Sequence, residues 1–302
     1  MVMNQMIDGL LVINKPKGMT SFDIVAKVRR LVGQKKVGHA GTLDPNVDGV
    51  LVVALGKATK LIDELQTRPK SYIGEITLGF ATETEDLDGQ VIEELSIDIP
   101  FSSEKIDNAI QQLNGPIKQK PPMYSAVKVN GKRLYEYARN GEIVERPIRE
   151  AMIHSFRRTS NILFANGLQK FDFEAKVSKG TYIRTLAVDT GQAIGIPATM
   201  TKLTRVMGSG FKIEESLHLD ELMRLEHNDV VAKVIPIKEV LDWPIKELNE
   251  DEWFAVKNGQ KISNWSPSNQ YLQLYYQNKL KAVYQYDEDG RVWRSRYVFD
   301  NQ

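Results

Sequence analysis

The residue of this 302-residue chain best placed to do chemistry is Asp44, which lies among residues that constrain the backbone. Residues 38–51 (GHAGTLDPNVDGVL) contain three glycines, one of four histidines, and Asp44 directly before Pro45. Glycine adopts backbone angles that other residues resist, whereas proline fixes its own φ and restricts the residue before it. We therefore expect a stiff loop that holds the Asp44 carboxylate in one orientation. Taken alone, an ordinary turn with a capping carboxylate is the commoner explanation of such a pattern.

The composition excludes several kinds of catalysis. The chain has no cysteine, so thiolate chemistry, disulfides, iron–sulfur clusters and cysteine-bound zinc are excluded. The four histidines show no metal-binding spacing, and we expect neither a metal nor another cofactor. An apolar content of 42% is ordinary for a globular protein, and no leader or membrane-length apolar run is evident. A cytoplasmic protein is the expectation.

The net charge of +1 conceals separated blocks of charge. Residues 76–110 carry one Lys or Arg against nine Asp or Glu, whereas residues 118–158 carry ten against four. An even mixture would indicate only a solvated surface, but a basic block favours contact with a polyanion. A solvated face remains the common alternative.

Regular elements are expected on both sides of the Asp44 loop. Residues 10–13 and 50–55 are short apolar runs typical of buried strands. Thr20 and Asp23 form a capping box that predicts a helix ending at Gly33, and residues 58–65 predict a short helix. The loop should therefore connect two buried segments.

Further along the chain, two strands and a helix carry candidate residues. Residues 72–78 alternate in polarity, which indicates an antiparallel strand that begins with Tyr72. Residues 180–194 predict a helix with Arg184 near its start, where a positive charge does not favour the helix dipole. Arg184 is therefore more plausibly placed for a partner than for helix stability, with a surface ion pair as the alternative. Residues 198–206 predict another strand.

The basic block combines cations with tyrosines. Asn130-Gly131 between short extended runs predicts a hairpin, and residues 134–140 predict a helical turn. Such a mixture suits phosphate contacts and base stacking. An excursion that covers a sheet edge explains it equally well. The candidate RNA-binding residues are Lys60, Lys128, Lys132, Arg133, Tyr135 and Arg139.

Residues 236–244 contain the best domain boundary. We expect a large domain over residues 1–240, with an insertion at about 118–150, and a small β-rich domain over residues 241–302. The overall class is α+β, with a mixed and mainly antiparallel sheet.

These motifs, taken together, resemble the TruB family of tRNA pseudouridine synthases. Residues 9–16 (GLLVINKP) are similar to its first motif, residues 38–45 (GHAGTLDP) to the motif with its catalytic aspartate, and residues 177–186 (VSKGTYIRTL) to the motif with its arginine. Lys70-Ser71-Tyr72 matches its tyrosine segment. The resemblance covers residues 9–206 and implies a pseudouridine synthase fold, with a tail similar to a PUA-type RNA-binding domain. One departure is Asp48, where the family has small residues.

The resemblance implies a role for each matched residue. Asp44 is the expected nucleophile, Tyr72 stacks on the base and helps move the C5 proton, and Arg184 pairs with Asp44 and keeps it ionised. The family places further residues in the substrate pocket: His39, Lys15, Leu203 and Asp86. The insertion is expected to grip the T-arm of tRNA.

The expected reaction agrees with the composition. Moving C1′ of the ribose from N1 to C5 of uracil involves no redox change, so it requires no cofactor. A carboxylate can act covalently, on the base or on the ribose, and the base must be flipped out of its loop. The resulting hypothesis is isomerisation of uridine 55 in the T-loop by a stand-alone monomer. The alternatives are a guide-RNA-dependent synthase like dyskerin, disfavoured by the compact chain, and a tRNA-folding helper with incidental catalysis; family members can combine catalysis with folding assistance.

Overall fold

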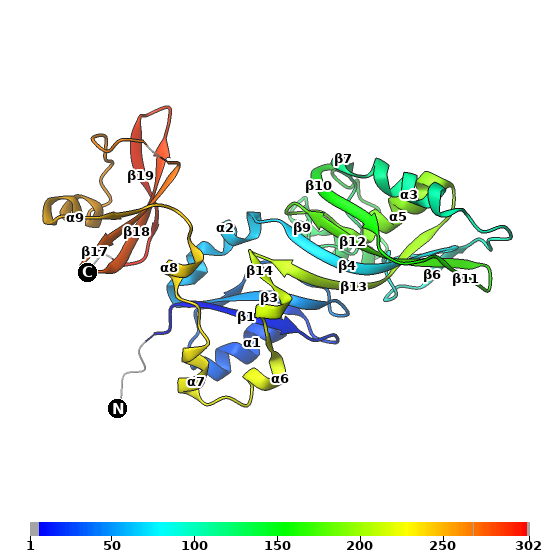
Figure 1. The fold of residues 1–302 in the computed structure, drawn as a ribbon, viewed down its shortest axis with the longest axis horizontal. Coiled ribbons are helices and arrows are strands. Elements are labelled where there is room, and N and C mark those ends of the chain that lie inside the picture. Colours follow the sequence, from blue (N-terminus) through cyan, green and yellow to red (C-terminus); the bar gives the residue numbers. More distant parts are fainter. Residues whose placement is uncertain (1–5, 268, 301–302) are drawn as a thin grey trace.

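A mixed sheet of 11 strands forms the centre of the molecule in the computed structural model, which describes residues 6–267 and 269–300 (Figure 1). Its main path runs in the order β15, β1, β3, β13, β4, β12, β10, β7, and β2, β11 and β14 attach at its margins. Most pairs are antiparallel, but β1–β15 and β3–β13 are parallel. The mixed, mainly antiparallel α+β class predicted from the sequence is confirmed. The strands along the path are β15 (Leu217–His218), β1 (Gly9–Lys15), β3 (Asp48–Leu55), β13 (Ala198–Gly208), β4 (Lys70–Leu78), β12 (Leu168–Val177), β10 (Arg149–Arg158) and β7 (Gly115–Gln119).

Helices cover the sheet because their apolar stripes complete its cores. Buried side chains of α1, α3 and α5 join those of β1, β4 and β12 in the largest apolar cluster. The capping box of Thr20 and Asp23 begins α1, and Gly33, with φ 66°, ends it, as predicted. The helices are α1 (Ser21–Val32), α2 (Ile62–Thr67), α3 (Ser103–Gln112), α4 (Leu134–Arg139), α5 (Ile183–Ile194), α6 (Leu219–Leu222), α7 (His227–Ala232), α8 (Ile237–Val240) and α9 (Glu250–Lys257).

The segment expected to be one helix over residues 58–65 is divided in two. A 3₁₀ helix, η1 (Gly56–Leu61), precedes α2, and Thr59 hydrogen-bonds back to the Gly56 carbonyl within it. A second 3₁₀ helix, η2 (Ile213–Glu215), follows the short strand β14 (Phe211–Lys212). None of the described helices has the length and apolarity to cross a membrane.

The insertion between β7 and β10 contains a small hairpin and a helix. Strands β8 (Lys128–Val129) and β9 (Lys132–Arg133) pair through a turn in which Asn130 and Gly131 both have positive φ. That conformation matches the twist of a two-residue hairpin, and the hairpin prediction is confirmed. Helix α4 follows directly. The remaining short strands are β2 (Val37–His39), β5 (Phe80–Thr82), β6 (Val91–Glu94) and β11 (Leu163–Ala165).

The C-terminal segment forms a separate four-stranded sheet at one end of the molecule (Figure 1). Its strands are β16 (Ile245–Glu247), β17 (Tyr271–Tyr276), β18 (Lys279–Asp287) and β19 (Val292–Val298). It has its own aromatic core around Trp253 and Trp293. Val283 and Phe299 also pack, together with α8, against apolar side chains of β1, β3 and η1. The small β-rich unit predicted from the sequence is therefore present and is anchored on the large sheet.

Candidate active site

The loop that carries Asp44 connects β2 to β3 and is held by backbone contacts. The Val47 N–H donates to the Asp44 carbonyl at 3.1 Å, which closes a turn around Pro45. Gly49 has φ 107°, and a Cβ there would lie 2.2 Å from the Arg205 carbonyl of β13. Only glycine permits this close approach of two backbones, so the end of the loop is fixed against the sheet.

Two side chains from earlier in the chain, those of Lys15 and Ser21, clamp the same loop. The Ser21 hydroxyl, at the start of α1, accepts from the Leu43 N–H at 2.8 Å and donates to the Leu43 carbonyl at 3.2 Å. The Lys15 ammonium donates to the carbonyls of Pro16, Met19 and Pro45. Lys15 is fully buried, and burial lowers its pKa to about 8. Lys15 therefore supports the Asp44 loop with all three of its donors. It is not among the residues that line the cavity beside Asp44.

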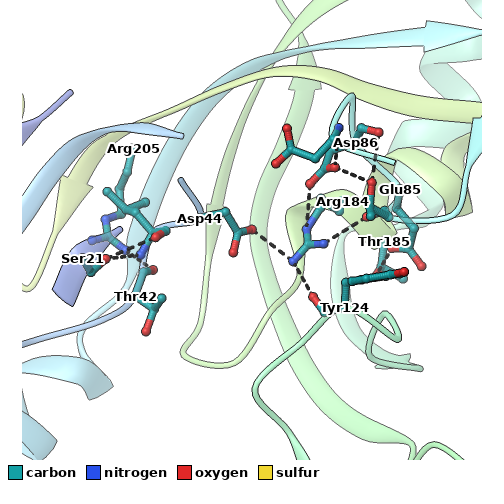
Figure 2. A network of polar contacts seen from close by, with 12 residues as sticks. Ser21, Thr42, Asp44, Glu85, Asp86, Tyr124, Arg184, Thr185 and Arg205 are labelled. Atoms are coloured by element: carbon teal, nitrogen blue, oxygen red, sulfur yellow. Dashed lines mark hydrogen bonds and ion pairs between the residues drawn. The ribbon is translucent and has the colours of Figure 1, made fainter. Parts of the chain in front are cut away.

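Arg184 connects Asp44 with two other segments of the chain. Its guanidinium lies 3.0 Å from the Asp44 carboxylate and 3.6 Å from that of Asp86. It also donates to the backbone carbonyls of Thr84 and Tyr124, at 3.0 and 3.1 Å. Figure 2 shows the guanidinium at the centre of these groups. Because it is only 7% exposed, this network fixes Arg184 at the start of α5 more firmly than a surface ion pair would.

The acidic loop that follows β5 is folded around Asp86. The Thr84 hydroxyl donates to the Asp86 carboxylate at 2.6 Å, and the Asp88 N–H donates to it at 3.1 Å. Burial raises the pKa of Asp86, while Thr84 and Arg184 oppose that shift. Glu85, with φ 66°, turns away and accepts from the Thr185 hydroxyl on α5. This loop is thus part of the site's framework.

A cavity of about 390 Å³ opens beside these groups. Asp44, Tyr72, Arg184 and Leu203 all line it, so four of the residues predicted from the sequence share one space. Tyr72 comes from β4, at the centre of the sheet, and lies opposite Arg205 in the register with β13. The Asp44 side chain is 42% exposed, whereas that of Arg184 is 8% exposed. The carboxylate can therefore reach a substrate while its partner remains covered.

Other predicted pocket residues lie outside the cavity wall. Asp86 is on the far side of Arg184, and His39 is half-buried at the end of β2, beside the loop. Burial lowers the pKa of His39, which favours the neutral ring at neutral pH. Asp48 accepts from the Thr204 hydroxyl at 2.5 Å at the start of β3 and is not in the cavity wall.

Several residues of the site had no role assigned from the sequence. Arg205 is buried and donates to the carbonyls of Val50, Thr42 and Gly41, so it holds both ends of the Asp44 loop. Figure 2 shows Asp44 between Arg205 and Arg184. Lys70 and Lys179 line the same cavity. Gln119, at the end of β7, exchanges two hydrogen bonds with the Tyr182 backbone and so ties the insertion to the start of α5.

The predicted RNA-binding residues occupy two places. Lys128, Lys132, Arg133, Tyr135 and Arg139 lie together on the β8–β9 hairpin and α4. Arg133 and Arg139 both lie over the Tyr135 ring, and Lys132 pairs with Glu142 at 2.7 Å. Lys60 is elsewhere: its ammonium donates to the Val298 carbonyl, between η1 and the C-terminal sheet. The structure therefore gathers five of the six and separates Lys60 from them.

The arrangement supports covalent or acid–base chemistry by a carboxylate. A partly exposed carboxylate, a fixed guanidinium and a phenol face one space, which is a suitable set for attack on a bound ring system. Within the described residues, no group of three or more His, Asp or Glu side chains could hold a metal ion.

Comparison with known proteins identifies the class. The profile described as "TruB family pseudouridylate synthase (N terminal domain)" matches residues 29–183. Proteins called tRNA pseudouridine synthase B are similar over most of their length. That of Lactiplantibacillus plantarum is 46% identical, covering 97% of this chain and 99% of that protein, and that of Bacillus pumilus is 43% identical, covering 91% and 95%.

Solved structures support the same fold at lower identity. A chain of a Cbf5–Nop10–Gar1 complex superposes with a TM-score of 0.70 at 23% identity, covering 97% of this chain and 85% of that one. A chain of an H/ACA RNP bound to a substrate RNA containing 2′-deoxyuridine superposes with a TM-score of 0.67 at 20% identity. The match covers 98% of this chain and 86% of that one. The family model and the relatives at 43–47% identity define the class as pseudouridine synthase, an enzyme that isomerises uridine to pseudouridine. The chain belongs to the TruB family.

Proposed function

We propose that this enzyme converts uridine 55 in the T-loop of tRNAs to pseudouridine, as a cytoplasmic monomer that uses no guide RNA. A tRNA substrate is supported by the names of the relatives, which are 43–47% identical over more than nine-tenths of the chain. The observation that best supports the proposal is the ion pair between Asp44 and Arg184, 3.0 Å long, at a cavity that Tyr72 also lines.

In the proposed mechanism the target uridine is flipped out of its loop into the cavity. Flipping costs a few kcal/mol, which contacts to the RNA backbone offset. Asp44, held by Arg184, then acts as the nucleophile and bonds to the uridine, and the N1–C1′ bond breaks. The detached base turns so that C5 bonds to C1′, the bond to Asp44 breaks, and N1 takes up a proton that balances the one lost from C5. Tyr72 stacks on the base and helps to remove the C5 proton, which completes the isomerisation.

Neighbouring residues have supporting roles in this proposal. Leu203 packs against the base, and Asp86 holds Arg184 from its far side. Lys15 supports the Asp44 loop from below. His39, beside the loop, contacts the flipped nucleotide or fills the space that it leaves.

The decisive experiment is incubation of the purified protein with an unmodified tRNA transcript, without cofactor or guide. We expect pseudouridine at one position of the T-loop, and its absence would overturn the proposal. Asp44→Asn should abolish product while tRNA affinity changes less than about threefold, because the amide keeps the shape but is not a nucleophile. Equal loss of affinity and product would make Asp44 a structural residue.

We also propose that the insertion over residues 118–150 grips the T-arm, and that residues 241–302 form a PUA-like RNA-binding domain. The cluster on β8, β9 and α4 supports the first point, since cations and tyrosines share one surface. Replacing Lys128 and Arg133 by alanine should weaken tRNA binding and lower its salt slope by about one to two. An unchanged slope would remove this surface from the interface. Lys60→Ala is the matched comparison, because its amine contacts the C-terminal sheet.

A further inference from the structure

Three cationic side chains that the proposed mechanism does not use line the cavity beside Asp44. They are Lys70 at the start of β4, Arg205 on β13 and Lys179 before α5. Lys70 and Arg205 are 8% and 1% exposed, so two of the three charges are withdrawn from water. Burying a charge is costly unless a partner balances it.

Lys70 and Arg205 lie close together across the Asp44 loop. A Cβ built on Gly41 would be 3.5 Å from Cε of Lys70 and 3.6 Å from Nη1 of Arg205. Both residues therefore border the same point of the loop, three residues before Asp44. Gly41 itself has φ 110°, a backbone conformation that favours glycine.

No carboxylate balances this cluster. Among residues 6–267 and 269–300, none forms an ion pair with Lys70, Lys179 or Arg205, whereas Asp44 and Asp86 both pair with Arg184. Burial, together with the charges of Arg205 and Lys179, lowers the pKa of Lys70 to about 8. The cluster thus has an excess of positive charge, and two of its three cations are buried.

Hydrogen bonds to the backbone explain only part of the arrangement. The Lys70 ammonium donates to the carbonyls of Gln66 and Arg68, at 2.9 and 3.3 Å. An ammonium has three N–H donors, so one donor remains for a ligand in the cavity. Arg205 spends its donors on the loop carbonyls and contributes mainly charge.

From this juxtaposition we infer that Lys70 and Lys179 form a binding site for one phosphate of the RNA backbone next to the flipped uridine. A phosphodiester supplies the missing negative charge and is attached to the nucleotide that the cavity receives. The contact would hold the nucleotide beside Asp44 and offset part of the flipping cost. This inference rests on the proposed function, because it takes the flipped nucleotide as the occupant.

The test is a double-mutant cycle between the lysine and the phosphate, read as binding affinity. The RNA is a T-arm hairpin with a neutral methylphosphonate in place of the phosphate 5′ or 3′ of the target uridine. The proteins are the full-length chain and its Lys70→Met and Lys179→Gln variants. Methionine keeps the apolar stem of Lys70 without the charge, and Lys179 is exposed, so its replacement leaves the core intact.

At one of the two positions, we expect the methylphosphonate to weaken wild-type binding about tenfold. Against Lys70→Met or Lys179→Gln the same substitution should cost less than about threefold, because the charge it would contact has gone. Lys233→Met, at an exposed lysine after α7, is the matched control and should leave the full tenfold effect.

Equal methylphosphonate effects in the wild type and both cavity variants, at both positions, would overturn the inference. The inference would also be overturned if the methylphosphonate effect were reduced equally in Lys233→Met, because that would indicate a general effect of charge. Because binding is the readout, these outcomes are distinct from failure of the proposed function, which is the absence of pseudouridine in the wild-type reaction.

Discussion

Asp44 lies between two groups of charged side chains that differ in how their charge is balanced. On one side, Arg184 contacts the carboxylates of Asp44 and Asp86 and two backbone carbonyls. Arg205 lies on the other side (Figure 2) and borders the same cavity as Lys70 and Lys179, and no ion pair balances these three cations in the part of the chain that the structure describes. The first group is complete without a ligand, and the second is not.

The difference separates two tasks. The guanidinium of Arg184 has protein partners on several sides, two carboxylates and two carbonyls, so its geometry is fixed before substrate arrives, as the proposed nucleophile Asp44 requires. The lysine group is costly in the free protein and becomes favourable only when an anion enters. Under the proposed function, the Arg184 group serves the chemistry and the lysine group serves recognition of the RNA.

Replacing Arg184 by lysine should produce the largest effect. A lysine ammonium cannot reach both carboxylates and both carbonyls that the guanidinium fork contacts, so Asp44 would lose its fixed partner. We expect the single-turnover rate to fall about 10²–10³-fold, as for the loss of one preorganised electrostatic group. Rapid-quench assays of pseudouridine formation measure it.

Arg157→Lys is the matched control, because Arg157 pairs with Glu174 on the surface. That variant should change the rate less than about twofold, in line with the small value of exposed ion pairs. If Arg184→Lys kept the wild-type rate, the Arg184 group would be structural and the comparison between the two sides would fail.

Replacing Lys70 by methionine should have a smaller effect. It should raise the stability of the folded protein. Burial, with Arg205 and Lys179 nearby, lowers the Lys70 pKa from 10.5 to about 8 in the folded protein. Below pH 8 the folded state carries the full cost of this charge. Between pH 8 and about 10.5 the unfolded state binds the extra proton, so stability rises with pH and the cost disappears.

Lys70→Met should therefore raise the free energy of unfolding by about 1–3 kcal/mol at pH 7, and by progressively less towards pH 10. Urea denaturation of the RNA-free protein at several pH values measures this. Lys233→Met should give no gain at any pH. If Lys70→Met were less stable than the wild type at pH 7, the fold would need the cation. The idea that the buried charge of Lys70 lowers stability and is retained for ligand binding would then be wrong.

The sequence predicted one side of the cavity better than the other, for a physical reason. Asp44, Tyr72 and Arg184 were found because each lies in a short motif with a recognisable order of residues. Lys70 and Arg205 follow from strand geometry, since alternate residues of a strand share a face. Lys70 is two residues before Tyr72 and Arg205 two after Leu203, so this rule applied to the motif residues would have found both.

The parts of the site that local sequence patterns could not predict depend on contacts between residues far apart in the chain. Arg205 contacts carbonyls more than 150 positions earlier, and Arg184 reaches a carbonyl 100 positions away. The folding of the acidic loop around Asp86 depends on such a partner, and no local pattern in its sequence indicates it. The elements themselves were largely predictable, because the capping box of α1, the Asn130-Gly131 turn and the alternation of β4 are local signals.

Replacing Asp48 by asparagine should have the smallest effect and a distinctive pH dependence. Asp48 accepts from the Thr204 hydroxyl at 2.5 Å, and the asparagine carbonyl can accept it as well, so the loop should keep its shape. The lost charge acts on Lys15, whose pKa burial lowers to about 8 while Asp48 and Asp44 oppose that shift. Without Asp48 the Lys15 pKa falls further, and Lys15 loses its proton nearer to neutral pH.

A neutral Lys15 amine supports the carbonyls of the Asp44 loop less firmly, because it has one donor fewer. We expect Asp48→Asn to match the wild-type rate within about twofold at pH 6.5 and to lose about three- to fivefold by pH 8. Asp23→Asn is the control, since Asp23 acts on Lys15 more weakly than Asp48, Asp44 or Arg205. A large loss that is the same at every pH would instead place Asp48 in the reaction itself, and the carboxylate beside Asp44 would then belong to the catalytic side of the comparison.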